Sequence, residues 1–166
     1  MVFKMNKKLE LSLKILLIVL IVSTLTFVFY QSSLPKKESA ELSQSASDII
    51  EPYIPSDTPT GAYIHTNIRK IAHFTEFFAL GFEIGLYVFL FLRKKRFVAY
   101  SFVAAPLVAL CDETIQIFSD RGSSVSDVWI DVLGYVCAAT AVYLIAFIIV
   151  CLKKRCAGAH GKDING

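Results

Sequence analysis

The stretch DETIQIFSDRGSSVSDVWID, residues 112–131, joins two apolar segments that are each long enough to cross a lipid bilayer. An ionised side chain at the centre of a membrane helix costs about 2.5–3.5 kcal/mol even on a lenient insertion scale, so packing alone does not explain this polar content. We therefore treat the stretch as the part of the chain that the surrounding helices are arranged to hold. Its prominent polar residues are Asp112, Glu113, Gln116, Arg121, Asp127 and Asp131.

The composition around this stretch is typical of an integral membrane protein. Of the 166 residues, 55% are hydrophobic and 19% are charged, whereas a soluble domain carries about 25% charged residues. A helix of about 20 residues spans the roughly 30 Å hydrocarbon layer. The sequence therefore predicts an all-α four-helix membrane bundle, with helices at about residues 11–30, 71–92, 97–118 and 128–152.

The basic residues predict the orientation of these helices. Lys and Arg gather before and within the start of the first segment (Lys4, Lys7, Lys8 and Lys14), at 93–96 and at 153–155. Such residues favour the cytoplasmic side, and the three groups share one side only if both termini are cytoplasmic. We predict a multi-pass membrane protein with both termini cytoplasmic, a basic N-terminus at 1–10, an irregular basic tail at 153–166, and external loops at 31–70 and 119–127. The net charge of +3 thus reflects topology, and no nucleic-acid partner is predicted.

The long external segment has two interpretations. Leu42, Ala46, Ile49 and Ile50 recur at the spacing of one helical face, which predicts a short amphipathic helix on the outer membrane surface. Three prolines within residues 51–61 then predict an extended connector. A disordered loop over residues 38–61 is the alternative.

Polar residues of three helices are expected to converge in the outer half of the bundle. The second helix enters from outside at Arg69, the third leaves after Phe118, and the fourth returns near Asp127. Glu83 lies deeper, about 21 Å along the helix from Arg69, where it is a candidate proton relay. The structural alternative is that the arginines merely neutralise carboxylates. The predicted pocket comprises Arg69, His73, Glu76, Asp112, Glu113, Gln116, Arg121, Asp127 and Asp131.

Three kinds of chemistry fit such a pocket. Clustered carboxylates raise one another's pKa and can serve as general acid and base. Arginines beside serines and a helix N-terminus can hold a phosphate or carboxylate group. A histidine with several carboxylates can bind a divalent metal, but His73 and Glu76, three residues apart, carry no strong metal-ligand signature, so we predict no metal and no cofactor.

The start of the fourth helix carries two local signals. Ser124 with Asp127 three residues later matches a helix N-terminal capping pair. Asp131, Gly134 and Ala138 share a face with Asp127, so small residues that allow close helix packing coincide with the polar side.

These motifs together resemble the VanZ-like family of small bacterial membrane proteins. The resemblance rests on RKIAHFTEFFALG (69–81), DETIQ (112–116), Arg121-Gly122 and Ser126-Asp127-Val128 with Gly134, and covers about residues 27–140. It implies a VanZ-like membrane domain over residues 11–152. The chain departs from many relatives at Asp131, where asparagine is common, and this adds a carboxylate to the pocket.

The resemblance also implies a role at the cell envelope. The family's namesake is an accessory glycopeptide-resistance protein that lowers susceptibility to teicoplanin more than to vancomycin. We expect a pocket that meets membrane lipids and a lipid-linked envelope precursor or a lipoglycopeptide. The alternatives are a membrane enzyme that uses Glu113 or Asp127 as acid or base, and a small proton-coupled carrier that relies on Glu83.

Overall fold

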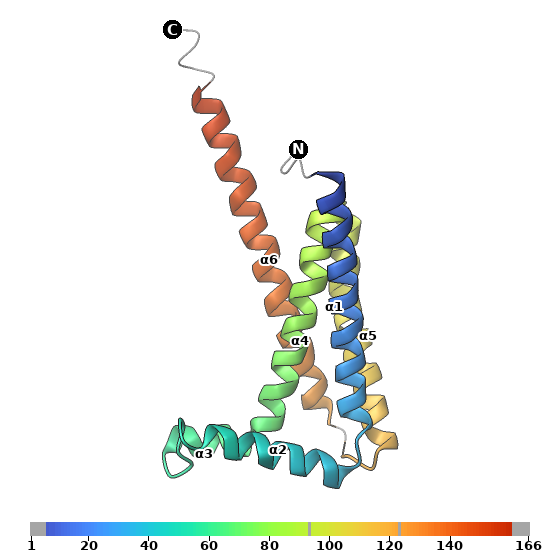
Figure 1. The fold of residues 1–166 in the computed structure, drawn as a ribbon, viewed down its shortest axis with the longest axis vertical. Coiled ribbons are helices and arrows are strands. Elements are labelled where there is room, and N and C mark those ends of the chain that lie inside the picture. The colour runs from blue at the N-terminus through green and yellow to red at the C-terminus, as the bar shows by residue number, and fades with distance from the viewer. Residues whose placement is uncertain (1–5, 93, 123, 161–166) are drawn as a thin grey trace.

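The computed structural model describes residues 6–92, 94–122 and 124–160 (Figure 1). Helix makes up 88% of the described residues and no strand occurs among them, which confirms the predicted all-α class. In chain order the helices are α1 (Lys7–Ser33), α2 (Lys36–Ile50), α3 (Pro59–Thr66), α4 (Ile68–Tyr87), the π-helical η1 (Val88–Leu92), α5 (Lys95–Phe118) and α6 (Val125–His160).

Four helical spans of the described chain are long and apolar enough to cross a membrane: α1, α4 continued by η1, α5 and α6. They run along the long axis of the molecule, and α2 and α3 lie across one end of the bundle (Figure 1). Helices suit the hydrocarbon layer because they satisfy their backbone hydrogen bonds internally. The helix α6 continues to His160, so the expectation of an irregular tail from residue 153 is wrong as far as residue 160. The rest of that tail, 161–166, lies outside the described residues.

The helices α4 and α6 pack closely because small residues line their crossing. A β-carbon added at Gly81 would lie 2.8 Å from Tyr135 Cα, and one added at Gly134 would lie 3.2 Å from the carbonyl carbon of Phe74. Ala138, one turn beyond Gly134, is fully buried. The small-residue face predicted on the fourth helix therefore forms this contact, and it brings α6 against the part of α4 that carries the polar residues.

The segment between α1 and α4 is helical over most of its length, so the disordered alternative for residues 38–61 is wrong. The prediction of an extended connector over 51–61 is wrong, because residues 51–58 form turns in which the Tyr53 and Ile54 N–H groups both donate to the Ile50 carbonyl. The helix α3 then already begins at Pro59, with the Thr58 hydroxyl accepting from Gly61 N–H at 3.0 Å. Leu42 and Ile49 are exposed, whereas Ser39 of α2 is buried. The helix α2 therefore turns the small polar Ser39 toward the bundle and leaves Ile49 facing outward.

Candidate functional site

Asp112 is the centre of a buried hydrogen-bond network that joins three helices. This α5 carboxylate is 0% exposed. It accepts from the Ser32 hydroxyl of α1 at 2.6 Å and from the Gln116 amide of α5 at 2.8 Å. Gln116 in turn accepts from the Arg69 guanidinium of α4 at 2.6 Å. These contacts fix the relative rotation of α1, α4 and α5 at one end of the bundle, because hydrogen bonds to a charged group are strong and directional.

His73 and Asp131 lie beside Asp112 and add α6 to the site. His73 Nδ1 is 3.7 Å from Asp112 Oδ2 and 3.8 Å from Asp131 Oδ1. Ligand atoms of the three residues lie within 4.8 Å of one another, an arrangement that could hold a metal ion. Residue spacing does not indicate this particular trio, because the three residues come from three different helices and match no metal-binding motif.

A cavity of about 110 Å³ opens between α2 and the bundle; we call it the α2 cavity. It is lined by Gln31, Ser39, Leu42, Ser43, Ala46, Ile68, Arg69, Ala72, His73, Glu76 and Arg121. The contributions of Gln31, Ser39 and Ser43 were missed by sequence reasoning, which treated the α2 segment only as a surface helix. For Ser39 and Ser43, the small polar side chains four residues apart on one face of α2 were the available signal, and for Gln31 no signal was available.

A second cavity of about 190 Å³, here the α6 cavity, lies between the starts of α4 and α6. Its lining includes Asp127 and Asp131 together with Arg69, His73 and Gln116. Arg69 and His73 line both cavities, so they connect the two spaces. Asp127 thus lies beside the buried network. Its carboxylate accepts a long hydrogen bond, of 3.4 Å, from the hydroxyl of the neighbouring Ser126.

Arg121 lies in the connection between α5 and α6 and is only 4% exposed. Its guanidinium donates to the Gln31 carbonyl, and its Nε atom has no hydrogen-bond acceptor among the described residues. Burial lowers the pKa of the Arg121 guanidinium from its ordinary value, and the charge of Arg69 lowers it further. The carboxylates of the site oppose that shift.

Glu113 contacts the connection between α5 and α6 and lines neither the α2 cavity nor the α6 cavity. Its carboxylate accepts from the Ser124 backbone N–H at 3.2 Å. Ser124 caps α6 by accepting from Ser126 N–H at 3.2 Å. In the predicted capping pair, Asp127 would take the Ser124 N–H, but Glu113 of the preceding helix occupies that position. Glu113 therefore fastens the beginning of α6 to α5.

Glu83 is separate from both cavities. It accepts from the Thr24 hydroxyl of α1 at 3.0 Å, deeper along α4. The structure thus brings together eight of the predicted pocket residues around the two cavities and the network between them, and it assigns Glu113 to the loop. The eight are Arg69, His73, Glu76, Asp112, Gln116, Arg121, Asp127 and Asp131.

Comparison with known proteins is consistent with this architecture. The sequence model of one family, VanZ/LLP1, matches residues 15–149, which include the four spanning segments almost entirely and every residue of the site. No curated protein and no solved structure matches the chain. From the length of the family match, together with the helical bundle, the chain belongs to the VanZ/LLP1 family of membrane proteins.

Proposed function

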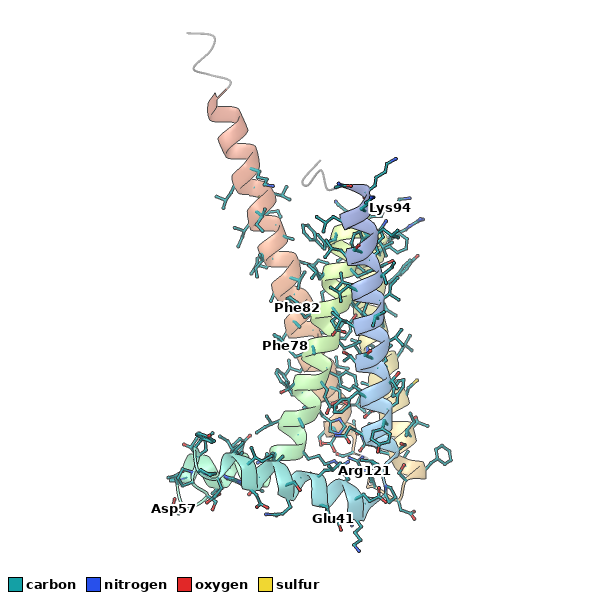
Figure 2. All side chains as sticks on the ribbon, viewed as in Figure 1. Glu41, Asp57, Phe78, Phe82, Lys94 and Arg121 are labelled. Atoms are coloured by element: carbon teal, nitrogen blue, oxygen red, sulfur yellow. The ribbon has the colours of Figure 1, made fainter. Side chains whose placement is uncertain are left out.

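We propose that this protein binds the anionic group of a cell-envelope molecule at the external face of the bacterial plasma membrane. The proposed orientation is supported by the groups of basic residues at the start of α1, at the start of α5 and at the far end of α6, which lie at the end of the bundle opposite the site. Fewer basic residues lie at the site's own end: Lys36, Lys37, Arg69, Lys70 and Arg121. Lys94 lies at one end of the molecule and Arg121 at the other (Figure 2). Because basic residues favour the cytoplasm, the cavities open to the outside and both termini lie inside.

The observation that carries the proposal is the buried, incompletely paired guanidinium of Arg121 at the α2 cavity. Arg69 provides a second guanidinium, and Ser39 and Ser43 line the facing side. Guanidinium groups bind carboxylate and phosphate oxygens in paired hydrogen bonds. An anion bound here would offset the burial and the mutual repulsion that lower the pKa of Arg121.

The cavity size indicates which part of an envelope molecule fits. Water occupies about 30 Å³ per molecule in the liquid, so about 110 Å³ holds a few waters or one phosphate or carboxylate group. The remainder of a lipid-linked ligand would extend along the exposed apolar faces of the bundle. A lipid-linked envelope precursor and the lipid-bearing part of a lipoglycopeptide both have this form. We therefore extend the proposal to reduced susceptibility to teicoplanin-type glycopeptides.

Susceptibility measurements test this function. The wild type, Arg121→Gln and Lys37→Gln would be expressed at matched membrane levels in a glycopeptide-sensitive Gram-positive host. Lys37 is the control, because its side chain is 89% exposed on α2 and does not line the α2 cavity. We expect the wild type and Lys37→Gln to protect against teicoplanin more than against vancomycin, and Arg121→Gln to lose that protection.

Two results would contradict the proposal at different levels. Absence of protection by the wild type would remove the glycopeptide role. Full protection by Arg121→Gln would remove anion binding at the α2 cavity.

The two alternative functions gain less support from the geometry. The enzyme hypothesis needs a free acid or base, but Glu113 is engaged by the Ser124 N–H, which leaves Asp127 as its candidate. The carrier hypothesis needs Glu83 to exchange protons with the site, yet Glu83 is bonded to Thr24 and lines neither cavity. Unchanged activity of Glu83→Leu would exclude the carrier hypothesis, and loss of activity in Asp127→Asn with retained ligand binding would favour the enzyme.

A further inference from the structure

The buried carboxylates behind the α2 cavity form a second feature that anion binding does not explain. Asp131 is 1% exposed, and neither of its carboxylate oxygens has a hydrogen-bond donor among the described residues. The His73 imidazole lies beside it, with its Nδ1 atom 3.8 Å from Asp131 Oδ1. A carboxylate removed from water normally requires full pairing by hydrogen bonds, an opposite charge or a metal ion. The site therefore lacks a positive partner for Asp131.

Asp112 and His73 supply the other features of a ligand set. Each Asp112 oxygen already accepts one hydrogen bond, from Ser32 or Gln116, which orients the carboxylate and leaves a lone pair on each oxygen. Such outer contacts are characteristic of metal-binding carboxylates. His73 Nδ1 has no hydrogen-bond partner among the described residues and faces both aspartates. Potential ligand atoms from three helices therefore lie within 4.8 Å of one another.

The distances fit a small divalent cation. Metal–ligand bonds of about 2.0–2.2 Å place the ligand atoms of a tetrahedral site about 3.3–3.6 Å apart. The two distances from His73 Nδ1, 3.7 and 3.8 Å, exceed this range only slightly, and all three ligand atoms lie within 4.8 Å of one another, so an ion would draw the ligands together around it. The α6 cavity, lined by His73 and Asp131, gives access from one side and has room for water at a fourth position.

The arginines do not occupy this position. Arg69 is bonded to the Gln116 oxygen, and Arg121 to the Gln31 carbonyl. Arg121 lines the α2 cavity and Arg69 lines both cavities. Neither guanidinium donates to Asp131, because both oxygens of that carboxylate lack a hydrogen-bond partner among the described residues.

We propose that His73, Asp112 and Asp131 bind a divalent transition-metal ion of the Zn²⁺ type, with an open position toward the α6 cavity. One imidazole and two carboxylates favour such an ion over Ca²⁺, which takes six to eight oxygen ligands, and over Mg²⁺, which prefers an octahedral oxygen shell. Three protein ligands with one open position are typical of a site at which the metal contacts an exchangeable molecule. This inference goes beyond the proposed anion binding and does not depend on it.

Metal titration of the full chain in detergent tests the proposal. The protein would carry a peptide tag without histidines, be stripped with chelator, and be titrated with Zn²⁺ against a chromophoric competitor. The variants are Asp131→Asn, His73→Phe and the control Asp127→Asn, whose residue lines the same cavity but lies outside the ligand set. The absorption spectrum of bound Co²⁺ would report the coordination geometry.

We expect one equivalent of Zn²⁺ in the wild type and in Asp127→Asn. Loss of outer contacts lowers metal affinity about 10–100-fold, so loss of a ligand in Asp131→Asn or His73→Phe should lower it about 100-fold or more. Ser32→Ala, which retains all three ligands, should weaken binding about tenfold and serves if a ligand variant does not fold. Failure of the wild type to bind Zn²⁺ would overturn the proposal, and so would wild-type affinity in both ligand variants.

Discussion

The contact between α4 and α6 offers a sharp test of the packing, because two glycines on one helix differ only in the space around them. In Gly81→Ala the new β-carbon would lie 2.8 Å from Tyr135 Cα and 2.9 Å from its carbonyl carbon. In Gly85→Ala it would lie 3.4 Å from Ala139 Cα and 3.5 Å from Val142 Cβ. Carbon atoms pack best at about 3.5–4.0 Å. The first substitution is therefore blocked by backbone, and the second makes an ordinary contact.

The expected free energies follow from two opposing effects. Replacing a helical glycine by alanine stabilises a helix by about 0.5–1 kcal/mol. Relieving the Gly81→Ala contact requires the two helices to separate by roughly 1 Å, and overpacking of this kind costs about 1–3 kcal/mol. Since backbone atoms cannot turn aside as a side chain can, we expect a net loss of about 2 kcal/mol for Gly81→Ala. We expect Gly85→Ala to be as stable as the wild type or slightly more stable.

Unfolding by SDS in mixed micelles would measure this difference, followed by the fluorescence of Trp129, the single tryptophan of the chain. A loss of 2 kcal/mol reduces the ratio of folded to unfolded protein about 30-fold. Equal stability of the two variants would refute the assigned helix contact, and so would a larger loss in Gly85→Ala.

Three further predictions concern the network, the topology and the connection between α2 and α3. Ser32→Ala should lower the free energy of unfolding by about 1–3 kcal/mol, because it leaves the buried Asp112 Oδ1 without its donor. The control Ser33→Ala changes an exposed neighbour and should alter this free energy little, so equal effects of the two variants in SDS unfolding would contradict the network. The topology can be tested in a background with all four cysteines replaced by alanine. Asp57→Cys, at the α2–α3 turn, should react with an impermeant thiol reagent on intact cells, and Lys94→Cys, at the other end of the bundle, only after lysis (Figure 2). The reverse pattern would contradict the predicted orientation. The Ser56 backbone N–H and hydroxyl both donate to Glu51, and these bonds lower its pKa below the ordinary 4.5, so their contribution to stability is complete above about pH 4.5 and is lost as the pH falls through the lowered pKa. An NMR titration should show the Glu51 midpoint below 4.5 in the wild type and part of the way back toward 4.5 in Ser56→Ala, which removes the hydroxyl donor and keeps the backbone N–H; identical midpoints would exclude the contribution of the hydroxyl.

Much of the candidate site was predictable because position along a helix gives depth in the bundle. Arg69, His73, Asp112 and Asp131 could be assigned to one end from the helix rise and the order of the segments alone. Their partners could not be assigned in this way. Glu113 is adjacent to Asp112 in sequence, yet Glu113 accepts a hydrogen bond from the Ser124 backbone N–H before α6, while Asp112 joins three helices. Neighbouring residues of a helix point about 100° apart, so small differences in helix rotation separate their roles.

The sequence by itself determined the four spanning segments and the end of the bundle at which the polar residues gather, because a bilayer requires long apolar helices and places their ends at its surfaces. Only the tertiary structure decided which faces meet. It set Gly81 against Tyr135, turned Ser39 of α2 inward, and brought His73, Asp112 and Asp131 to one position. The physical reason is that lipid tails are as apolar as the helix surfaces, so hydrophobicity gives no direction to helix pairing. Close packing of small residues and hydrogen bonds between helices select the partners, and both depend on the shape of surfaces that exist only after the helices have assembled.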